Sequence, residues 1–136
     1  KAETEREAVA QATVRMSAAA IRAIRSRAVT KGDPLQTARL AGIVAAKRTS
    51  ELIPLCHPLA LSHVDIDLRA RPRGYDIRSR VVTVGRTGVE MEALVAVSVA
   101  ALTLYDMLKA VDRAITIGPI QLMEKRGGRS GHYRRR

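Results

Sequence analysis

The segment from residue 89 to residue 112 constrains the fold more than any other, because its pattern predicts one long helix. The small side chains Ala93, Ala96 and Ala100 lie on one face of that helix, so a neighbouring element can approach its backbone closely. The chain has no Phe or Trp and only three Tyr. We therefore expect a core of Ala, Val, Leu and Ile in closely packed layers.

Alternating apolar and polar residues predict the strands. Residues 8–16 alternate with a period of two, which favours a strand. Residues 60–70 and 75–84 alternate in the same way on either side of a turn at 71–74, which predicts a hairpin. Residues 113–124 are interpreted as the last strand, interrupted by a Gly-Pro pair.

Capping residues mark the starts of the helices. Ser17 is suited to cap a short helix over residues 18–28, and Asp33 followed by a proline predicts a second helix that ends near residue 46. Thr87 and Glu90 have the spacing of a capping box for the long helix. The order βα(α)ββαβ predicts an α+β fold of the ferredoxin-like split βαβ type, in a single domain over residues 1–136. Its antiparallel four-stranded sheet would have helices on one face, and we expect another subunit to cover the other face.

The charge of the chain favours anionic partners. The net charge is +11, and six of the 24 Lys and Arg residues lie in the last twelve positions, where we expect a flexible basic tail over about residues 126–136. A basic excess attracts nucleic acid or a phosphorylated small molecule. A nucleic-acid-binding module is thus the alternative function, but the scarcity of aromatic residues makes it unlikely because single-strand binding depends on base stacking. A purely structural scaffold is a further alternative.

Several classes are excluded or not expected. The single cysteine excludes an internal disulfide and any C-x-x-C zinc site. Three scattered histidines with one thiol do not give the ligand spacing of a metal centre. We find no apolar run of membrane-spanning length and no signal peptide. We therefore expect a soluble cytoplasmic protein with no membrane association and no bound metal.

The connector at residues 47–58 combines two cations, a carboxylate, a thiol and an imidazole. Prolines lie on both sides of Cys56 and His57 and stiffen this segment. Adjacent side chains of an extended segment point in opposite directions, so Cys56 and His57 are not expected to act as a thiolate–imidazole pair. The structural interpretation is a small buried thiol and a hydrogen-bonded histidine, whereas the functional one is a site for an anionic ligand.

Three further groups of charged residues each have a functional and a structural interpretation. The capping box explains Glu90, which leaves Glu92 as the better candidate for a site carboxylate. Asp106 and Lys109 lie at i, i+3, which fits either a surface ion pair or an acid–base pair partly withdrawn from water. Lys31 precedes a helix N-terminus that favours anions, although the spacing alone favours a solvated turn lysine.

Four segments together carry a resemblance to a known family. They are KGDPLQTARLAGIVAAKRTSELIPLCHP at 31–58, GRTGVEMEAL at 85–94, YDMLKAVD at 105–112 and EKRGGRSG at 124–131. In this order the chain resembles the MoaC family, the cyclic pyranopterin monophosphate synthases of molybdenum cofactor biosynthesis. The resemblance covers essentially the whole chain.

The resemblance implies a specific reaction. Such enzymes convert 3′,8-cyclo-7,8-dihydroguanosine triphosphate into cyclic pyranopterin monophosphate and release pyrophosphate, which makes them lyases. It also implies a ferredoxin-like fold, no metal or organic cofactor, and a homo-oligomer, a hexamer built as a trimer of dimers with each site near a subunit interface.

The resemblance also implies roles for individual residues. Asp106, Lys109 and Lys31 match the essential acid–base group. Positions that contact the substrate, or that match charged pocket positions, are Leu55, Cys56, His57, Met91, Glu92, Glu90, Lys47, Lys125, Arg6 and Lys1.

Physical chemistry suggests how these residues would act. Lys47, Lys125 and Arg6 are candidates for a phosphate clamp, because fixed cations stabilise the charge that builds up in phosphoryl transfer. We expect neighbouring cations and apolar walls to lower the pKa of Lys31 or Lys109, with Asp106 orienting Lys109.

Overall fold

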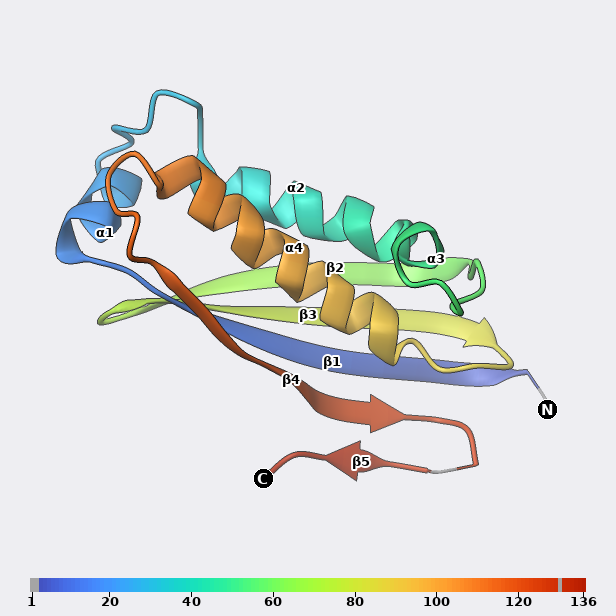
Figure 1. Cartoon of the computed structure of the whole chain (residues 1–136). Coiled ribbons are helices and arrows are strands. Elements are labelled where there is room, and N and C mark those ends of the chain that lie inside the picture. Colours follow the sequence, from blue (N-terminus) through green and yellow to red (C-terminus); the bar gives the residue numbers. More distant parts are fainter. Residues whose placement is uncertain (1–2, 130) are drawn as a thin grey trace.

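The chain folds around one antiparallel sheet of five strands, and the computed structural model describes residues 3–129 and 131–136. The strands are β1 (Thr4–Arg15), β2 (Leu61–Arg71), β3 (Gly74–Gly85), β4 (Thr116–Arg126) and β5 (Tyr133–Arg134). They lie in the order β2-β3-β1-β4-β5, and every neighbouring pair is antiparallel. The first four strands have the predicted order of the ferredoxin-like arrangement, with β2 and β3 as the predicted hairpin (Figure 1).

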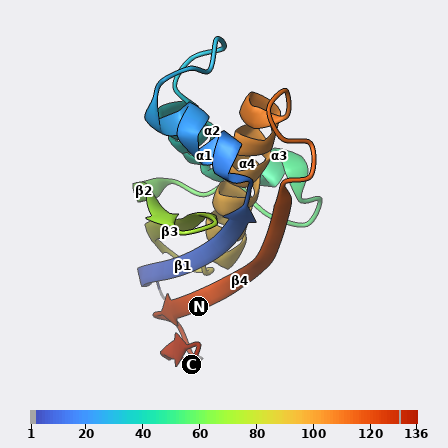
Figure 2. The same cartoon turned by 90° about the vertical axis from the view of Figure 1, so that its left-hand side faces the viewer.

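The helices cover one face of this sheet, as predicted, so the α+β fold class is confirmed (Figures 1 and 2). The two long helices, α2 and α4, pack against each other and run in opposite directions above the strands. The helices are α1 (Ala18–Arg25), α2 (Pro34–Lys47), α3 (Thr49–Leu52) and α4 (Glu90–Leu108).

The core is built from small aliphatic side chains, as the composition predicted. On β1, Ala8, Ala10, Ala12 and Val14 are fully buried on the helix-covered face, because alternate residues of a strand point to the same side. The alanines of α4 that define its predicted close-packed face are also fully buried. The sheet and α4 therefore approach each other closely along the middle of the molecule.

Two of the three predicted helix caps are confirmed. The hydroxyl of Ser17 accepts a hydrogen bond from the Ala20 amide at 3.1 Å. The Asp33 carboxylate accepts from the Leu35 amide at 3.0 Å, with Pro34 as the first helical residue. Each side chain satisfies an amide that has no partner inside its helix.

The capping box predicted for the long helix is wrong. Helix α4 begins at Glu90, its N-cap residue is Val89, and no side chain caps it. The Glu90 carboxylate instead forms an ion pair with Lys125 of β4 at 3.0 Å. A partner that is distant in sequence has thus replaced the local hydrogen bond.

The connector after α2 contains a short helix that the sequence did not predict. Thr49 starts α3 and is buried, and its hydroxyl donates to the carbonyls of Ala45 and Ala46 at 3.2 and 3.0 Å. The Ile53 amide donates a hydrogen bond to the Thr49 carbonyl, and the Cys56 amide donates one to the Ile53 carbonyl. The chain is therefore coiled up to Cys56 rather than extended.

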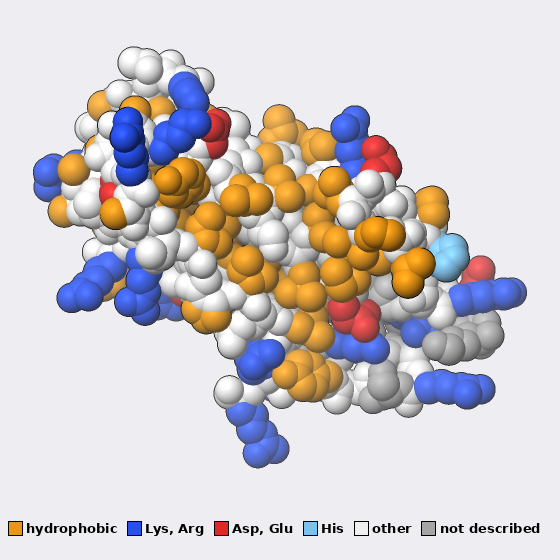
Figure 3. All heavy atoms as spheres, in the orientation of Figure 1, with side chains coloured by type: hydrophobic (Ala, Val, Ile, Leu, Met, Phe, Trp, Pro, Cys, Tyr) orange, Lys and Arg blue, Asp and Glu red, His pale blue; other side chains and the backbone are white. Residues whose placement is uncertain are grey.

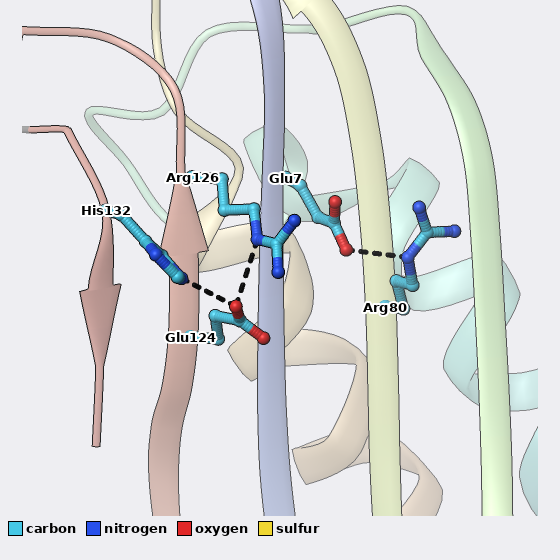
Figure 4. A network of polar contacts seen from close by, with 5 residues as sticks. All are labelled: Glu7, Arg80, Glu124, Arg126 and His132. Atoms are coloured by element: carbon cyan, nitrogen blue, oxygen red, sulfur yellow. Dashed lines mark hydrogen bonds and ion pairs between the residues drawn. The ribbon is translucent and has the colours of Figure 1, made fainter. Parts of the chain in front are cut away.

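The C-terminal segment, expected to be a flexible tail, contributes the fifth strand. Glu124 of β4 contacts His132 at 2.6 Å and Arg126 at 3.0 Å (Figure 4). The Arg135 guanidinium donates to the Leu122 carbonyl at 2.8 Å. These contacts fold the segment back along β4.

The face of the sheet opposite the helices is charged. In Figure 4, Arg80 of β3 reaches Glu7 of β1 at 2.7 Å. Asp76 accepts hydrogen bonds from Thr13 and Arg71 at 3.1 and 2.7 Å. Acidic and basic side chains thus pair across neighbouring strands on this face.

Helix α4 is long and apolar enough to cross a membrane by length and composition, although the sequence reading found no such run. In the fold, 56% of the 18-residue apolar stretch within α4 is buried. Its buried residues face the sheet and α2, whereas Leu102 is exposed, so the core accounts for much of its hydrophobicity.

Candidate active site

The first candidate site lies at the C-terminal end of α4, where two segments distant in sequence meet. Asp106 is the centre of the contact. Its carboxylate lies 2.8 Å from the Lys109 ammonium and 3.5 Å from the Lys31 ammonium. Lys31 also lies 3.5 Å from the carbonyl oxygen of Asp106. The structure therefore brings all three predicted acid–base residues together.

A cavity of about 590 Å³, which we call the Asp106 cavity, surrounds this cluster. One wall is the loop between α1 and α2, and the other is the last turn of α4 with the residues that follow it. Its described lining is Ala28, Val29, Thr30, Lys31, Tyr105, Asp106, Met107, Lys109, Ala110, Val111 and Arg113.

Local structure explains how Lys31 and Lys109 reach one carboxylate. Asp106 and Lys109 are one helical turn apart and face the same side. Lys31 comes just before Asp33, whose capping hydrogen bonds fix the start of α2. The loop therefore ends at a fixed point beside α4.

The cluster is exposed, which agrees with the surface ion pair of the two interpretations and not with partial withdrawal from water. The side chain of Asp106 is 57% exposed and those of Lys31 and Lys109 are 53% and 52% exposed. The Lys109 hydrogen bond, followed by the charges of Lys109 and Lys31, lowers the pKa of Asp106. The same hydrogen bond raises the pKa of Lys109, which reverses the lowering expected from the sequence.

A second, smaller cavity of about 270 Å³ lies near the opposite end of α4, and we call it the Glu92 cavity. Six of the residues predicted to contact the substrate or match its pocket line this cavity, three from the Cys-His connector and three from the start of α4. The described lining is Leu55, Cys56, His57, Leu59, Thr87, Gly88, Glu90, Met91 and Glu92.

Glu92 is the buried carboxyl of this second cavity. It is only 4% exposed, and burial raises its pKa, with a smaller contribution from the charge of Glu90. Glu90 itself folds back over Gly88 toward Lys125, so a methyl group at Gly88 would overlap the Glu90 carboxylate. Any other residue at position 88 therefore requires the Glu90 side chain to move from its ion pair with Lys125.

The remaining predicted residues come from three elements. Arg6 is 6% exposed, and its guanidinium donates to the Gly85 carbonyl at 2.9 Å beside Gly128. Arg6 of β1 and Lys125 of β4 lie on neighbouring strands, where Ala8 pairs with Lys125. Lys47 is exposed on the last turn of α2 and is not among the described residues that line either cavity. Lys1 lies outside the described residues.

Within residues 3–129 and 131–136, no group of three or more His, Cys, Asp or Glu side chains is arranged to hold a metal ion. Cys56 is a free, partly buried thiol.

Comparison with known proteins identifies the family of this chain. The model of the MoaC family matches residues 1–128. The chain belongs to the MoaC family. It is 58% identical to a cyclic pyranopterin monophosphate synthase from Thermomicrobium roseum over 137 aligned positions, 99% of this chain and 82% of that protein. It is also 57% identical to a protein of the same name from Heliobacterium modesticaldum, over 98% of this chain and 85% of that protein.

The MoaC-family fold also places residues at the site that the sequence reading missed. Tyr105 and Arg113 line the Asp106 cavity, and Thr87 and Gly88 line the Glu92 cavity. Arg113 lies four residues after Lys109, just beyond the end of α4, and this spacing indicates that it can reach the same cavity. The sequence prediction instead placed Arg113 in the last strand.

Proposed function

We propose that this MoaC-family chain is a cyclic pyranopterin monophosphate synthase. It converts 3′,8-cyclo-7,8-dihydroguanosine triphosphate to cyclic pyranopterin monophosphate and releases pyrophosphate, as a lyase in an early step of molybdopterin biosynthesis. The named relatives, which match over nearly the whole chain, support this reaction. The contact of Asp106 with both Lys31 and Lys109 is the observation that carries the proposal.

The electrostatics of the cluster suggest which form each residue takes. Asp106 and Lys109 are both charged at neutral pH by their ordinary pKa values, and their contact reinforces this: Lys109 and Lys31 lower the pKa of Asp106, and Asp106 raises the pKa of Lys109. In this state Asp106 holds the Lys109 ammonium in place as a fixed cation. Because a raised pKa makes an ammonium a weaker acid, proton donation by Lys109 near neutral pH requires burial or neighbouring cations to lower that pKa. The cations also attract the substrate, which carries about four negative charges, and stabilise the departing pyrophosphate.

The two cavities lie too far apart in one chain to form one site. Glu92 and Asp106 are 14 residues apart on α4, which corresponds to about 21 Å of helix. Reacting groups must lie within about 3–3.5 Å of each other. We therefore propose that the Asp106 cavity of one chain and the Glu92 cavity of another combine at a subunit interface.

The surface is consistent with such an assembly. Hydrophobic side chains gather over α2 and α4 in Figure 3, and Leu40, Leu52 and Leu102 are each more than half exposed. At the Glu92 cavity, Leu55 is 91% exposed. We propose a homo-oligomer, a hexamer built as a trimer of dimers, that acts in the cytoplasm on a small-molecule substrate without metal or organic cofactor. Turnover that persists with a metal chelator present would support the proposal that no metal cofactor is needed.

The decisive assay incubates the purified protein with the cyclised GTP derivative and measures the cyclic-phosphate pterin and pyrophosphate. Asp106→Asn, Lys109→Ala and Lys31→Ala should each lower turnover by at least about a hundredfold while the protein stays folded. Asp67→Asn is the matched control, since Asp67 also forms an exposed ion pair, with Arg69 at 2.9 Å. Near-normal turnover of the three variants would refute the assignment.

A mixing experiment tests the shared site. Asp106→Asn disables one half-site and Glu92→Gln the other, so each variant alone should be inactive. Co-refolding the two in equal amounts should restore about a quarter of the wild-type sites, because mixed pairs contain one intact combination. If each chain carries a complete site, the mixture will remain inactive.

A further inference from the structure

The loop that follows α4 presents one more cation to the Asp106 cavity. Arg113 lines this cavity together with Lys31, Asp106 and Lys109. It lies four residues beyond Lys109, the C-cap residue of α4, and the family resemblance assigned no role to it.

The backbone around Arg113 is held on both sides. The Tyr105 hydroxyl donates to the Arg113 carbonyl at 3.0 Å. The Asp112 carboxylate accepts from the Ser17 amide at 2.8 Å and from the Ala114 amide at 2.9 Å. These amides, Ser17 first, lower the pKa of Asp112, which stays ionised at neutral pH and keeps the loop in place.

The side chain of Arg113, in contrast, is free. Among residues 3–129 and 131–136, none forms a hydrogen bond or ion pair with its guanidinium, and the residue is exposed. Asp106 is already paired with both lysines. Three cations therefore face one carboxylate in this cavity, which leaves a positive excess for an anionic ligand.

We infer that Arg113 binds a phosphate group of the substrate's triphosphate, an inference that rests on the proposed function. A guanidinium can donate two parallel hydrogen bonds to a phosphate, whereas an ammonium acts as a point charge. The fixed loop reduces the entropy lost when the side chain binds. Lys31 and Lys109 remain engaged with Asp106, and Arg113 anchors the charged end of the substrate.

Steady-state kinetics test this role. Arg113→Ala should raise KM by at least about tenfold while kcat changes by less than about threefold, because the contact is made equally in the bound substrate and the transition state. Arg113→Lys, which keeps the charge but loses the two-pronged geometry, should lie between the wild type and Arg113→Ala. The matched control is Arg22→Ala, which removes one exposed arginine of α1 that is not among the described residues lining the cavity.

Calorimetric titration with inorganic pyrophosphate separates this inference from the proposed reaction. Arg113→Ala should weaken pyrophosphate binding by at least about tenfold and Arg22→Ala by less than about twofold. This result without turnover of the cyclised substrate would support the phosphate contact while the proposed reaction fails. Normal turnover with KM and pyrophosphate binding unchanged in Arg113→Ala, or equal weakening in both variants, would overturn the inference.

Discussion

The close approach of α2 to α4 at Gly42 gives the sharpest test of the packing that positions both cavities. A Cβ atom at Gly42 would lie 2.9 Å from the carbonyl oxygen of Ala96, 3.2 Å from Cδ1 of Ile66 and 3.3 Å from Cβ of Ala100. The substitution Gly42→Ala therefore crowds a helix backbone as well as two side chains. The backbone oxygen cannot rotate away, so α2 must shift off α4.

Two opposing contributions decide the sign of this change. Alanine favours a helix over glycine by about 1 kcal/mol, which alone would stabilise the protein. Overpacking of a filled core costs about 1–3 kcal/mol, and here three neighbours are crowded at once. We expect Gly42→Ala to lower the free energy of unfolding by about 1–2 kcal/mol, which corresponds to a decrease in Tm of about 3–8 °C for a chain of this length.

Urea and thermal unfolding, followed by circular dichroism at one fixed protomer concentration, measure this effect. The control is Ala41→Gly, one position earlier on the same helix, which isolates the propensity contribution and should cost about 1 kcal/mol. A Gly42→Ala protein at least as stable as the wild type, beside a destabilised Ala41→Gly protein, would show that α2 and α4 are not in this contact.

Three further outcomes are expected. Glu92→Gln should raise the free energy of unfolding at pH 8 but not at pH 4. Burial raises the pKa of Glu92, so its contribution to the stability of the wild type is fully present below the ordinary value of 4.5 and is lost as the pH rises through the folded value. Urea unfolding at both pH values measures this. Glu124→Gln should speed proteolysis of the C-terminal segment at neutral pH, since His132, followed by Arg126, lowers the pKa of Glu124. The contribution of Glu124 to the wild type is present above its ordinary pKa and is lost as the pH falls through the lower folded value, so the two proteins should converge in acid. Ser79→Ala should cost about 1 kcal/mol in chemical denaturation, because the buried Ser79 hydroxyl donates to a carbonyl of α4 at 2.9 Å; an unchanged midpoint would contradict that contact.

The sequence predicted β1, β2 and β3 because apolar and polar residues alternate along them. On β1 the alternation of Ala10 with Gln11 matches the buried and half-buried sides of the strand. The caps at Ser17 and Asp33 were equally accessible, since each acts on amides two or three residues away. Patterns of this kind are local, and their physical cause lies within the segment itself.

The parts of the fold that were not predicted depend on distant or very short contacts. Glu90 has the spacing of a capping box, but its partner Lys125 lies 35 residues further along the chain. Strand β5 has two residues, too few to show any alternation. The helix at Thr49 is stabilised by hydrogen bonds back to the end of α2. No periodicity within these segments reveals such contacts.

The candidate site also combines contacts that the local sequence predicts with contacts that it does not. The pairing of Asp106 with Lys109 follows from their i, i+3 spacing. Lys31 is 75 residues from Asp106, so only the family resemblance could suggest their contact. The spacing left the exposure of the cluster open, because the apolar neighbours of Asp106 favoured burial. In the fold Leu104, Met107 and Leu108 are buried in the core, and Asp106 lies on the exposed side of the helix.

The exposure of the Asp106 cluster bears on how the proposed site would work. In one chain Lys31, Asp106 and Lys109 are each more than half exposed, and water and salt weaken interactions between exposed charges. Charged groups in a catalytic site act most strongly where water is excluded and the effective dielectric constant is low. A second chain that brings its Glu92 cavity to the Asp106 cavity would both complete the set of contacts and remove this water. Assembly and catalysis would then share one physical cause, which is why Asp106→Asn and Glu92→Gln should each abolish turnover alone without unfolding the chain, whereas their mixture should regain shared sites.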